Sequence, residues 1–93
     1  MKYVITYDVG NDKRRTKLST LLEAYGVRVN YSVYECELNQ TKFDKLLYEI
    51  SLQKLVEKKY DSLRFYYIHE SSIGKSFEFA NRADPFEYEE MIL

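Results

Sequence analysis

The order of apolar and polar residues predicts a strand followed by a helix at the start of the chain. Residues 2–9 alternate between an aromatic and β-branched face and a second face that ends at Asp8. Gly10 breaks this strand, and a helical spacing follows over residues 12–25. The apolar stripe of this helix has the spacing i, i+3, i+4 and i+7 and consists of Leu18, Leu21, Leu22 and Tyr25.

The middle of the chain predicts two more strands, a second helix and a last strand. Residues 27–38 are β-prone and too long for one average strand, so we predict two short strands bent around residues 30–32. A helix over residues 40–58 and a strand over residues 63–68 follow. The order β-α-β-β-α-β is typical of the α+β ferredoxin-like fold, and we assign residues 1–68 to one such domain.

Residues 69–93 are left over as a C-terminal extension. Phe77 and Phe79 alternate with polar residues, which predicts a short additional strand, and Pro85 fits an edge or a turn. A single chain of 93 residues buries only about 60–65% of its unfolded surface. We therefore expect a homodimer in which this extension packs on the partner subunit or on its own sheet edge.

Composition and charge narrow the class of protein. One Cys suits a reducing cytosol and excludes a disulfide framework, and no apolar stretch is long enough for a membrane span, so we expect a cytoplasmic protein with no membrane partner. The net charge of −1 hides an uneven distribution. Residues 1–31 hold six basic and three acidic side chains, whereas residues 69–93 hold two basic and six acidic ones. The basic front half is suited to nucleic acid, and the acidic extension to protein contacts.

Asp8 is the main candidate for chemistry. A carboxylate at a strand end beside a loop suits a hard divalent cation, which prefers oxygen ligands. The alternative is that Asp8 caps the following turn. A two-fold axis near Asp8 would bring two carboxylates together and favour the metal site.

A run of cations opens the first predicted helix and is the second candidate. Lys13, Arg14, Arg15 and Lys17 repel one another at a helix N-terminus, where the helix dipole disfavours positive charge. Tolerance of this cost indicates a polyanion such as a phosphate backbone, while a solvated, acid-paired face is the equally weighted alternative. Arg28 adds either a phosphate contact or an ion pair. For the ten Tyr residues we favour packing over base stacking.

Four segments occur in one register over residues 2–68 and carry a resemblance. They are YD at the end of the first strand, DKRR at the start of the first helix, RVNYSVYE at residues 28–35 and LRFYYI at residues 63–68. Together they resemble the CRISPR-associated Cas-two family, the second core Cas protein. The resemblance implies ferredoxin-like homodimers whose sheets pack face to face, with C-terminal strands that cross to the partner.

The resemblance also implies roles for individual residues. Asp8 of each subunit would hold Mg²⁺ across the dimer, and the further catalytic residues would be Tyr7, Arg15 and Lys17. The last of these is usually Arg in the family. The implied nucleic-acid contacts are Lys13, Arg14, Arg15, Lys17, Arg28, Ser32 and Tyr34, the last of which is often Phe in the family.

Two classes of function follow from this resemblance. As an enzyme, the homodimer would be a metal-dependent endonuclease that cleaves phosphodiester bonds of single-stranded RNA or double-stranded DNA. As a non-catalytic module, it would bridge Cas integrase dimers on protospacer DNA during spacer acquisition in antiviral defence. We favour the integration role, with nuclease activity beside it, over a third class, a toxin-like RNA interferase.

Overall fold

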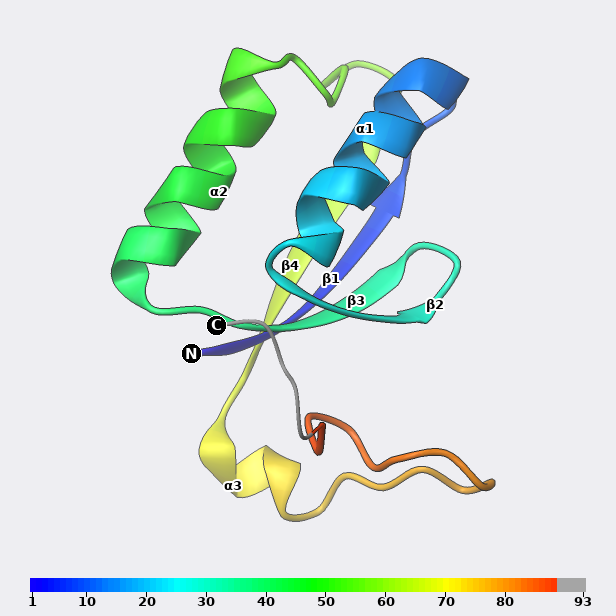
Figure 1. Ribbon diagram of the computed structural model, residues 1–93, viewed down its shortest axis with the longest axis vertical. Coiled ribbons are helices and arrows are strands. Elements are labelled where there is room, and N and C mark those ends of the chain that lie inside the picture. The colour runs from blue at the N-terminus through cyan, green and yellow to red at the C-terminus, as the bar shows by residue number, and fades with distance from the viewer. Residues whose placement is uncertain (89–93) are drawn as a thin grey trace.

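The computed structural model describes residues 1–88 and contains an antiparallel sheet with helices α1 and α2 on one face (Figure 1). The strand order is β2-β3-β1-β4, so β1 lies between β3 and β4. This arrangement confirms the predicted ferredoxin-like fold. The elements are β1 (Lys2–Asp8), α1 (Asp12–Glu23), β2 (Gly26–Asn30), β3 (Val33–Glu37), α2 (Gln40–Leu52), β4 (Ser62–Ile68) and α3 (Glu70–Ile73).

Asparagine side chains start both long helices. Asn11 accepts a hydrogen bond from the Arg14 backbone N–H at 3.0 Å, and Asn39 accepts one from the Lys42 N–H at 2.8 Å. Each bond satisfies a donor that has no partner within the helix. Within residues 1–88, no helix has the length and apolar character that crossing a membrane requires.

The second helix ends six residues before its predicted end, at Leu52 rather than residue 58. Lys54 has a φ of 52°, which lies outside the right-handed helical region and turns the chain. This turn brings Leu55 into the core, where it is fully buried. The sequence-based expectation was wrong here because burial of Leu55 outweighs helix propensity. The first helix is also shorter than predicted, ending at Glu23.

The core lies between the sheet and the two long helices. Its fully buried side chains come from both layers and include Ile5, Leu18, Leu22, Tyr34, Cys36 and Leu46. Tyr3 extends this layer by stacking on Phe43, with ring centroids 5.2 Å apart. Gly26 packs so closely on β3 that a Cβ would lie 2.4 Å from both the Cys36 Sγ and the Glu35 carbonyl oxygen. The predicted split of residues 27–38 into two strands is confirmed.

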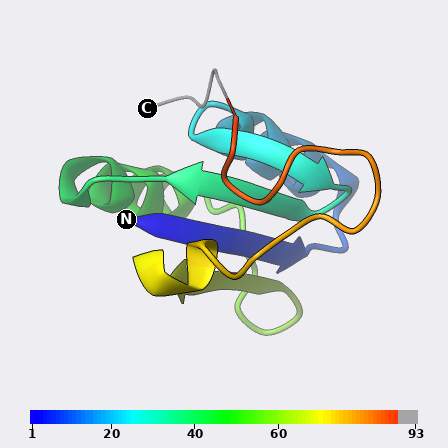
Figure 2. The same cartoon turned by 90° about the horizontal axis from the view of Figure 1, so that it is seen from below.

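The extension crosses the opposite face of the sheet (Figure 2). It begins with α3, a short helix that the sequence reasoning missed, and it returns to β3. There the Phe86 N–H and the Tyr88 hydroxyl donate to the Glu35 carboxylate at 2.9 and 2.8 Å. Its packing on a partner subunit stays a prediction, and residues 89–93 of the predicted extension lie outside the described part.

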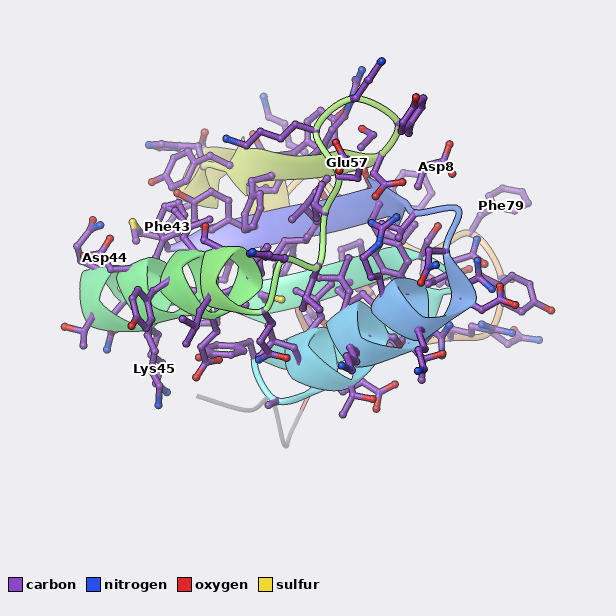
Figure 3. All side chains as sticks on the ribbon, turned by 90° about the horizontal axis from the view of Figure 1, so that it is seen from above. Asp8, Phe43, Asp44, Lys45, Glu57 and Phe79 are labelled. Carbon is purple, nitrogen blue, oxygen red and sulfur yellow. The ribbon has the colours of Figure 1, made fainter. Side chains whose placement is uncertain are left out.

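The strand predicted around Phe77 and Phe79 is wrong. These residues do not pair with a sheet edge, and their exposed fractions are 69% and 94%. Phe79 projects from the loop of the extension (Figure 3). The alternation of apolar and polar residues is therefore no sign of a half-buried strand at this position, because no neighbouring strand supplies hydrogen bonds.

Candidate nucleic-acid and metal site

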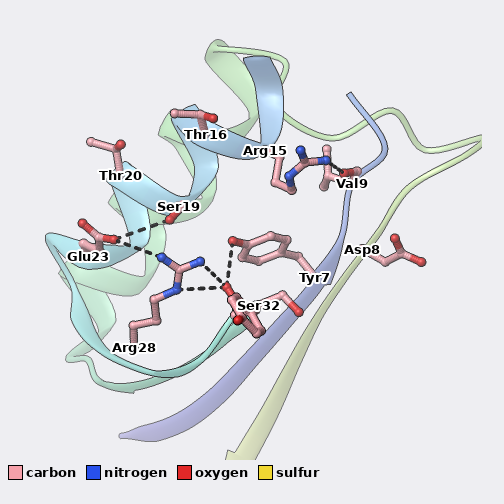
Figure 4. A pocket seen from close by; sticks show the side chains of 11 residues that line it. Tyr7, Asp8, Val9, Arg15, Thr16, Ser19, Thr20, Glu23, Arg28 and Ser32 are labelled. Atoms are coloured by element: carbon pink, nitrogen blue, oxygen red, sulfur yellow. Dashed lines mark hydrogen bonds and ion pairs between the residues drawn. The ribbon is translucent and has the colours of Figure 1, made fainter. Parts of the chain in front are cut away.

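The end of the sheet where β1 stops contains a pocket of about 600 Å³ between α1 and the β2–β3 turn. Four of the residues predicted from sequence, Tyr7, Arg15, Arg28 and Ser32, line it together, and Asp8 lies at its edge (Figure 4). Since these residues come from three separate segments, the fold brings together what the sequence left scattered. The pocket is open to solvent and is large enough for a phosphate and its sugar.

Arg28 is held in place by the β2–β3 turn. Its Nε and Nη2 atoms donate to the Tyr31 carbonyl oxygen at 3.0 and 2.6 Å. Its Nη1 lies 3.9 Å from the Glu23 carboxylate, and the side chain remains 44% exposed. The ion-pair alternative for Arg28 is therefore observed with Glu23, and the phosphate contact stays a prediction for a guanidinium that still faces the pocket.

Two stacked tyrosines support the floor of the pocket. The rings of Tyr7 and Tyr34 lie 6.3 Å apart at 25°, and the Arg28 guanidinium lies 5.9 Å from the Tyr34 ring. Burial raises the pKa of Tyr34, and its hydroxyl lies 2.8 Å from the Ser19 hydroxyl oxygen. Tyr34 is fully buried, so it has no surface for the nucleic-acid contact predicted from sequence. Its ring lies beneath the Arg28 guanidinium instead.

Arg15 differs from the lysines around it. Its guanidinium donates to the Val9 carbonyl oxygen at 3.1 Å and forms an ion pair with Asp12, so it is fixed beside the end of β1. Lys13 and Lys17 are exposed and have no acidic partner among the described residues. They lie outside the pocket lining and form a separate, free basic surface on α1.

Arg14 points to another part of the molecule. It forms an ion pair with Asp61 and donates to the Leu55 carbonyl oxygen at 3.3 Å. The Asp61 side chain is only 2% exposed, so Arg14 ties α1 to the loop before β4. Its predicted nucleic-acid contact stays a prediction, and the observed role is structural.

Asp8 is exposed at the end of β1, and its carboxylate points away from Tyr7 and Arg28 (Figure 4). Figure 4 shows no interaction between this carboxylate and the other pocket residues. The alternative, a cap on the following turn, is not observed, because the Asp8 carboxylate accepts no hydrogen bond from the described residues, and Asn11 caps the helix after that turn. An exposed carboxylate without a partner among the described residues offers the oxygen ligands that a hard divalent ion prefers.

Comparison with known protein families gives a match over most of the chain. The family described as CRISPR associated protein Cas2 matches residues 1–76. The chain belongs to this family. The resemblance inferred from the four sequence segments is therefore confirmed.

Cas2 relatives resemble the chain in sequence and in structure. "CRISPR-associated endoribonuclease Cas2 3" of Synechocystis sp. is 52% identical over 64 residues, which cover 69% of this chain and 67% of that protein. The crystal structure of Streptococcus pyogenes Cas2 at pH 6.5 has a TM-score of 0.71 at 28% identity and covers 86% of this chain and 100% of that one. A chain of a partial Cas6-RT-Cas1–Cas2 complex has a TM-score of 0.69 at 31% identity, over 94% of this chain and 91% of its own.

The sequence reasoning missed one wall of the pocket. Helix α1 supplies Thr16, Ser19, Thr20 and Glu23, which follow Arg15 along the helix. Ser19 and Glu23 lie at i+4 and i+8 from Arg15, and Thr20 lies at i+4 from Thr16, so the helical spacing was available in the sequence as a signal. Three of these residues, Thr16, Ser19 and Thr20, place hydroxyl groups beside the two arginines, and Glu23 places a carboxylate there.

Proposed function

We propose that this chain is a nucleic-acid-binding subunit of CRISPR spacer acquisition that works as a homodimer and cleaves phosphodiester bonds with Mg²⁺ at Asp8. The observation that carries this proposal is the exposed Asp8 carboxylate, which lies without a partner beside the Arg15 and Arg28 pocket. The endoribonuclease name of the Synechocystis relative supports nuclease activity.

The residues fit a metal only when two copies are combined. Within residues 1–88, no three His, Cys, Asp or Glu side chains gather closely enough to hold a metal ion. One subunit therefore supplies one carboxylate, and a second subunit is needed for a two-carboxylate site with retained water ligands. When bound, Mg²⁺ would supply a more acidic water and offset negative charge at the scissile phosphate.

The chain's own side chains do the binding in this proposal. Arg28, fixed by the Tyr31 carbonyl and the Tyr34 ring, holds a phosphate oxygen without having to be ordered first. Arg15 approaches from the opposite wall, held by the Val9 carbonyl. Lys17 adds long-range attraction from α1. Charged donors that are already oriented cost little reorganisation when charge develops on the phosphate.

The homodimer proposed from the family has a structural consequence. Face-to-face packing uses the sheet face opposite the helices, and the extension lies on that face in a single subunit. The dimer therefore requires the extension to move aside or to become part of the interface. Its acidic charge suits a contact with a basic protein partner, such as the Cas integrase.

A second function, a non-catalytic scaffold, is favoured by one observation. Lys13 and Lys17 are exposed cations, and they lie outside the pocket that has Asp8 at its edge. Such a surface binds the backbone of a DNA duplex without any metal. The structural likeness to a chain of a Cas1–Cas2 complex supports a role beside the integrase.

Replacement of Asp8 separates the two functions. We expect Asp8→Asn to slow Mg²⁺-dependent cleavage of RNA or duplex DNA by about a hundredfold or more, as for other groups that stabilise developing charge. Asp44→Asn is the matched control, because Asp44 is also exposed but lies at the opposite end of the molecule (Figure 3). The measurement is the rate of labelled-substrate cleavage beside integration by the reconstituted complex.

Each outcome has a definite meaning. Loss of cleavage with normal integration supports the metal site and shows that integration needs only the scaffold. Equal cleavage rates for Asp8→Asn and Asp44→Asn would exclude Asp8 as the metal ligand and overturn the catalytic part of the proposal.

A further inference from the structure

The loop between α2 and β4 is a charged and aromatic surface that the pocket does not include. Residues 53–61 carry three exposed lysines and one exposed tyrosine, namely Lys54, Lys58, Lys59 and Tyr60. Asp8 pairs with Ser62 in the sheet, and Tyr60 precedes Ser62 by two residues, which span at most about 7 Å. The loop therefore lies at the same end of the sheet as the candidate metal ligand.

Two anchors hold this loop in one conformation. Leu55 is fully buried in the core at one end. At the other end the Asp61 carboxylate accepts hydrogen bonds from the Gly10 and Glu57 backbone N–H groups at 3.3 and 2.8 Å. Asp61 also pairs with Arg14. The residues between the anchors are thus presented on a fixed turn, which lowers the entropy lost on binding a ligand.

The anchoring also leaves the loop with positive charge. Arg14 neutralises Asp61, so Glu57 is the remaining acid within residues 53–61 against the three lysines. Figure 3 shows Glu57 and Asp8 near the same end of the molecule. A net positive loop beside the Asp8 carboxylate attracts phosphates toward that carboxylate.

Tyr60 gives this basic loop an aromatic surface. The residue is 78% exposed, although a tyrosine ring is usually at least half covered. The Lys59 ammonium lies 5.4 Å from the centre of its ring, as in a cation–π contact. An exposed ring beside cations that bind the backbone is the combination that single-stranded nucleic-acid sites use.

We propose that Tyr60 is a stacking platform for an unpaired base, and that Lys58 and Lys59 hold the phosphates on either side of that base. The inference deepens the proposed function, on which it rests, by adding a contact for an unpaired base at the Asp8 end of the sheet. In a duplex each base already stacks on its neighbours, so the Tyr60 ring has no free base face to bind. The lysines bind phosphates of either form.

The test measures binding rather than cleavage, with EDTA present so that no metal takes part. The probes are a fluorescein-labelled RNA strand, a DNA strand of the same sequence and the corresponding DNA duplex, followed by fluorescence anisotropy. We expect Tyr60→Leu to weaken binding of both single strands about tenfold and duplex binding by less than about twofold, because stacking contributes only to the single strands.

Three further variants control for shape and charge. Tyr60→Phe keeps the ring and should bind single strands like the wild type. Tyr48→Leu removes another exposed tyrosine, on α2, and should leave all three affinities unchanged. Lys58→Gln combined with Lys59→Gln should weaken every probe and reduce the slope of log affinity against log salt by about 0.7 per lysine on single strands.

The results that would overturn the inference differ from those that would overturn the proposed function. Wild-type affinity of Tyr60→Leu for the single strands, or an equal loss on single strands and duplex, excludes base stacking on Tyr60. The second result would indicate that the ring contacts the backbone or shapes the loop. Failure of Asp8→Asn to affect cleavage would remove the catalytic proposal, while Tyr60-dependent binding in EDTA would remain.

Discussion

The two faces of the sheet differ in what covers them. On one face, α1 and α2 bury a continuous apolar layer in which Ile5, Leu22 and Tyr34 have no exposed surface. On the other face, the extension covers part of β3 and is held through polar contacts to Glu35. One face is closed by apolar packing along its length, and the other is crossed by the extension, a strap whose Phe86 and Tyr88 form hydrogen bonds to Glu35.

This difference indicates which parts of the molecule carry stability and which remain available for partners. Burial of apolar surface contributes most of the free energy of folding, so the helix-covered face determines the fold. A segment held by a few hydrogen bonds opens at a much lower free energy than the whole domain. The sheet face that the extension crosses, called the strapped face below, is therefore the one that a second subunit can reach.

The largest effect is expected on the helix-covered face. Leu22→Ala should lower the free energy of unfolding by about 2–5 kcal/mol, because it removes a fully buried side chain and leaves a cavity. Leu52→Ala is the matched control, since Leu52 is 64% exposed on α2 and should change stability by less than about 0.5 kcal/mol. Urea unfolding followed by circular dichroism measures both, and similar losses would contradict the assignment of the core.

A smaller effect is expected at acid pH, at the contact between α1 and the α2–β4 loop. The Arg14 hydrogen bond, followed by the Glu57 backbone N–H, lowers the pKa of Asp61 from its ordinary value of 3.8. The stability contributed by the charged form is complete above the unfolded pKa and is lost as pH falls through the lower folded pKa. Asp61→Asn should therefore flatten the acid dependence of the urea midpoint, whereas Asp44→Asn should keep the wild-type curve.

The smallest effect is expected on the strapped face. Tyr88→Phe removes one hydrogen bond to Glu35, worth about 1 kcal/mol, and should speed hydrogen exchange of the Phe86 amide about fivefold without changing global stability. Burial, followed by the hydrogen bond to Glu35, raises the pKa of Tyr88 to about 12, so this contact persists through neutral pH. Tyr66→Phe is the control on the same face, and unchanged exchange in Tyr88→Phe would show that the strap does not depend on this bond.

Local pattern predicted the long elements well because their periodicity is strong. The stripe of Leu18 and Leu22 predicted the buried face of α1, and the bend at residues 30–32 predicted the β2–β3 turn. The pattern predicted a helix at Leu55, but this residue lies in a loop and is buried in the core. It predicted a strand at Phe77 and Phe79, but these residues lie in an exposed loop. In both places, the position of the rest of the chain overrides local propensity.

The candidate site was predicted only in part, because contacts between residues distant in sequence complete it. Sequence reasoning identified Asp8, Arg15 and Arg28 as candidates, and the structure places all three at one pocket. It grouped Arg14 with its neighbours on α1, because a run of four cations contains no sign that one of them pairs with Asp61. It also missed Tyr60, whose exposure depends on how the α2–β4 loop is anchored.

The sequence by itself determined the order of the elements, the family and the residue types available for phosphate and metal binding. These properties depend on near neighbours along the chain and on motif spacing. Only the tertiary structure distinguished buried Tyr34 from exposed Tyr60, and paired Asp61 from free Asp8. Whether a side chain is buried, and whether its charge has a partner, depends on groups that are distant in sequence. These groups meet only when the sheet and helices pack together.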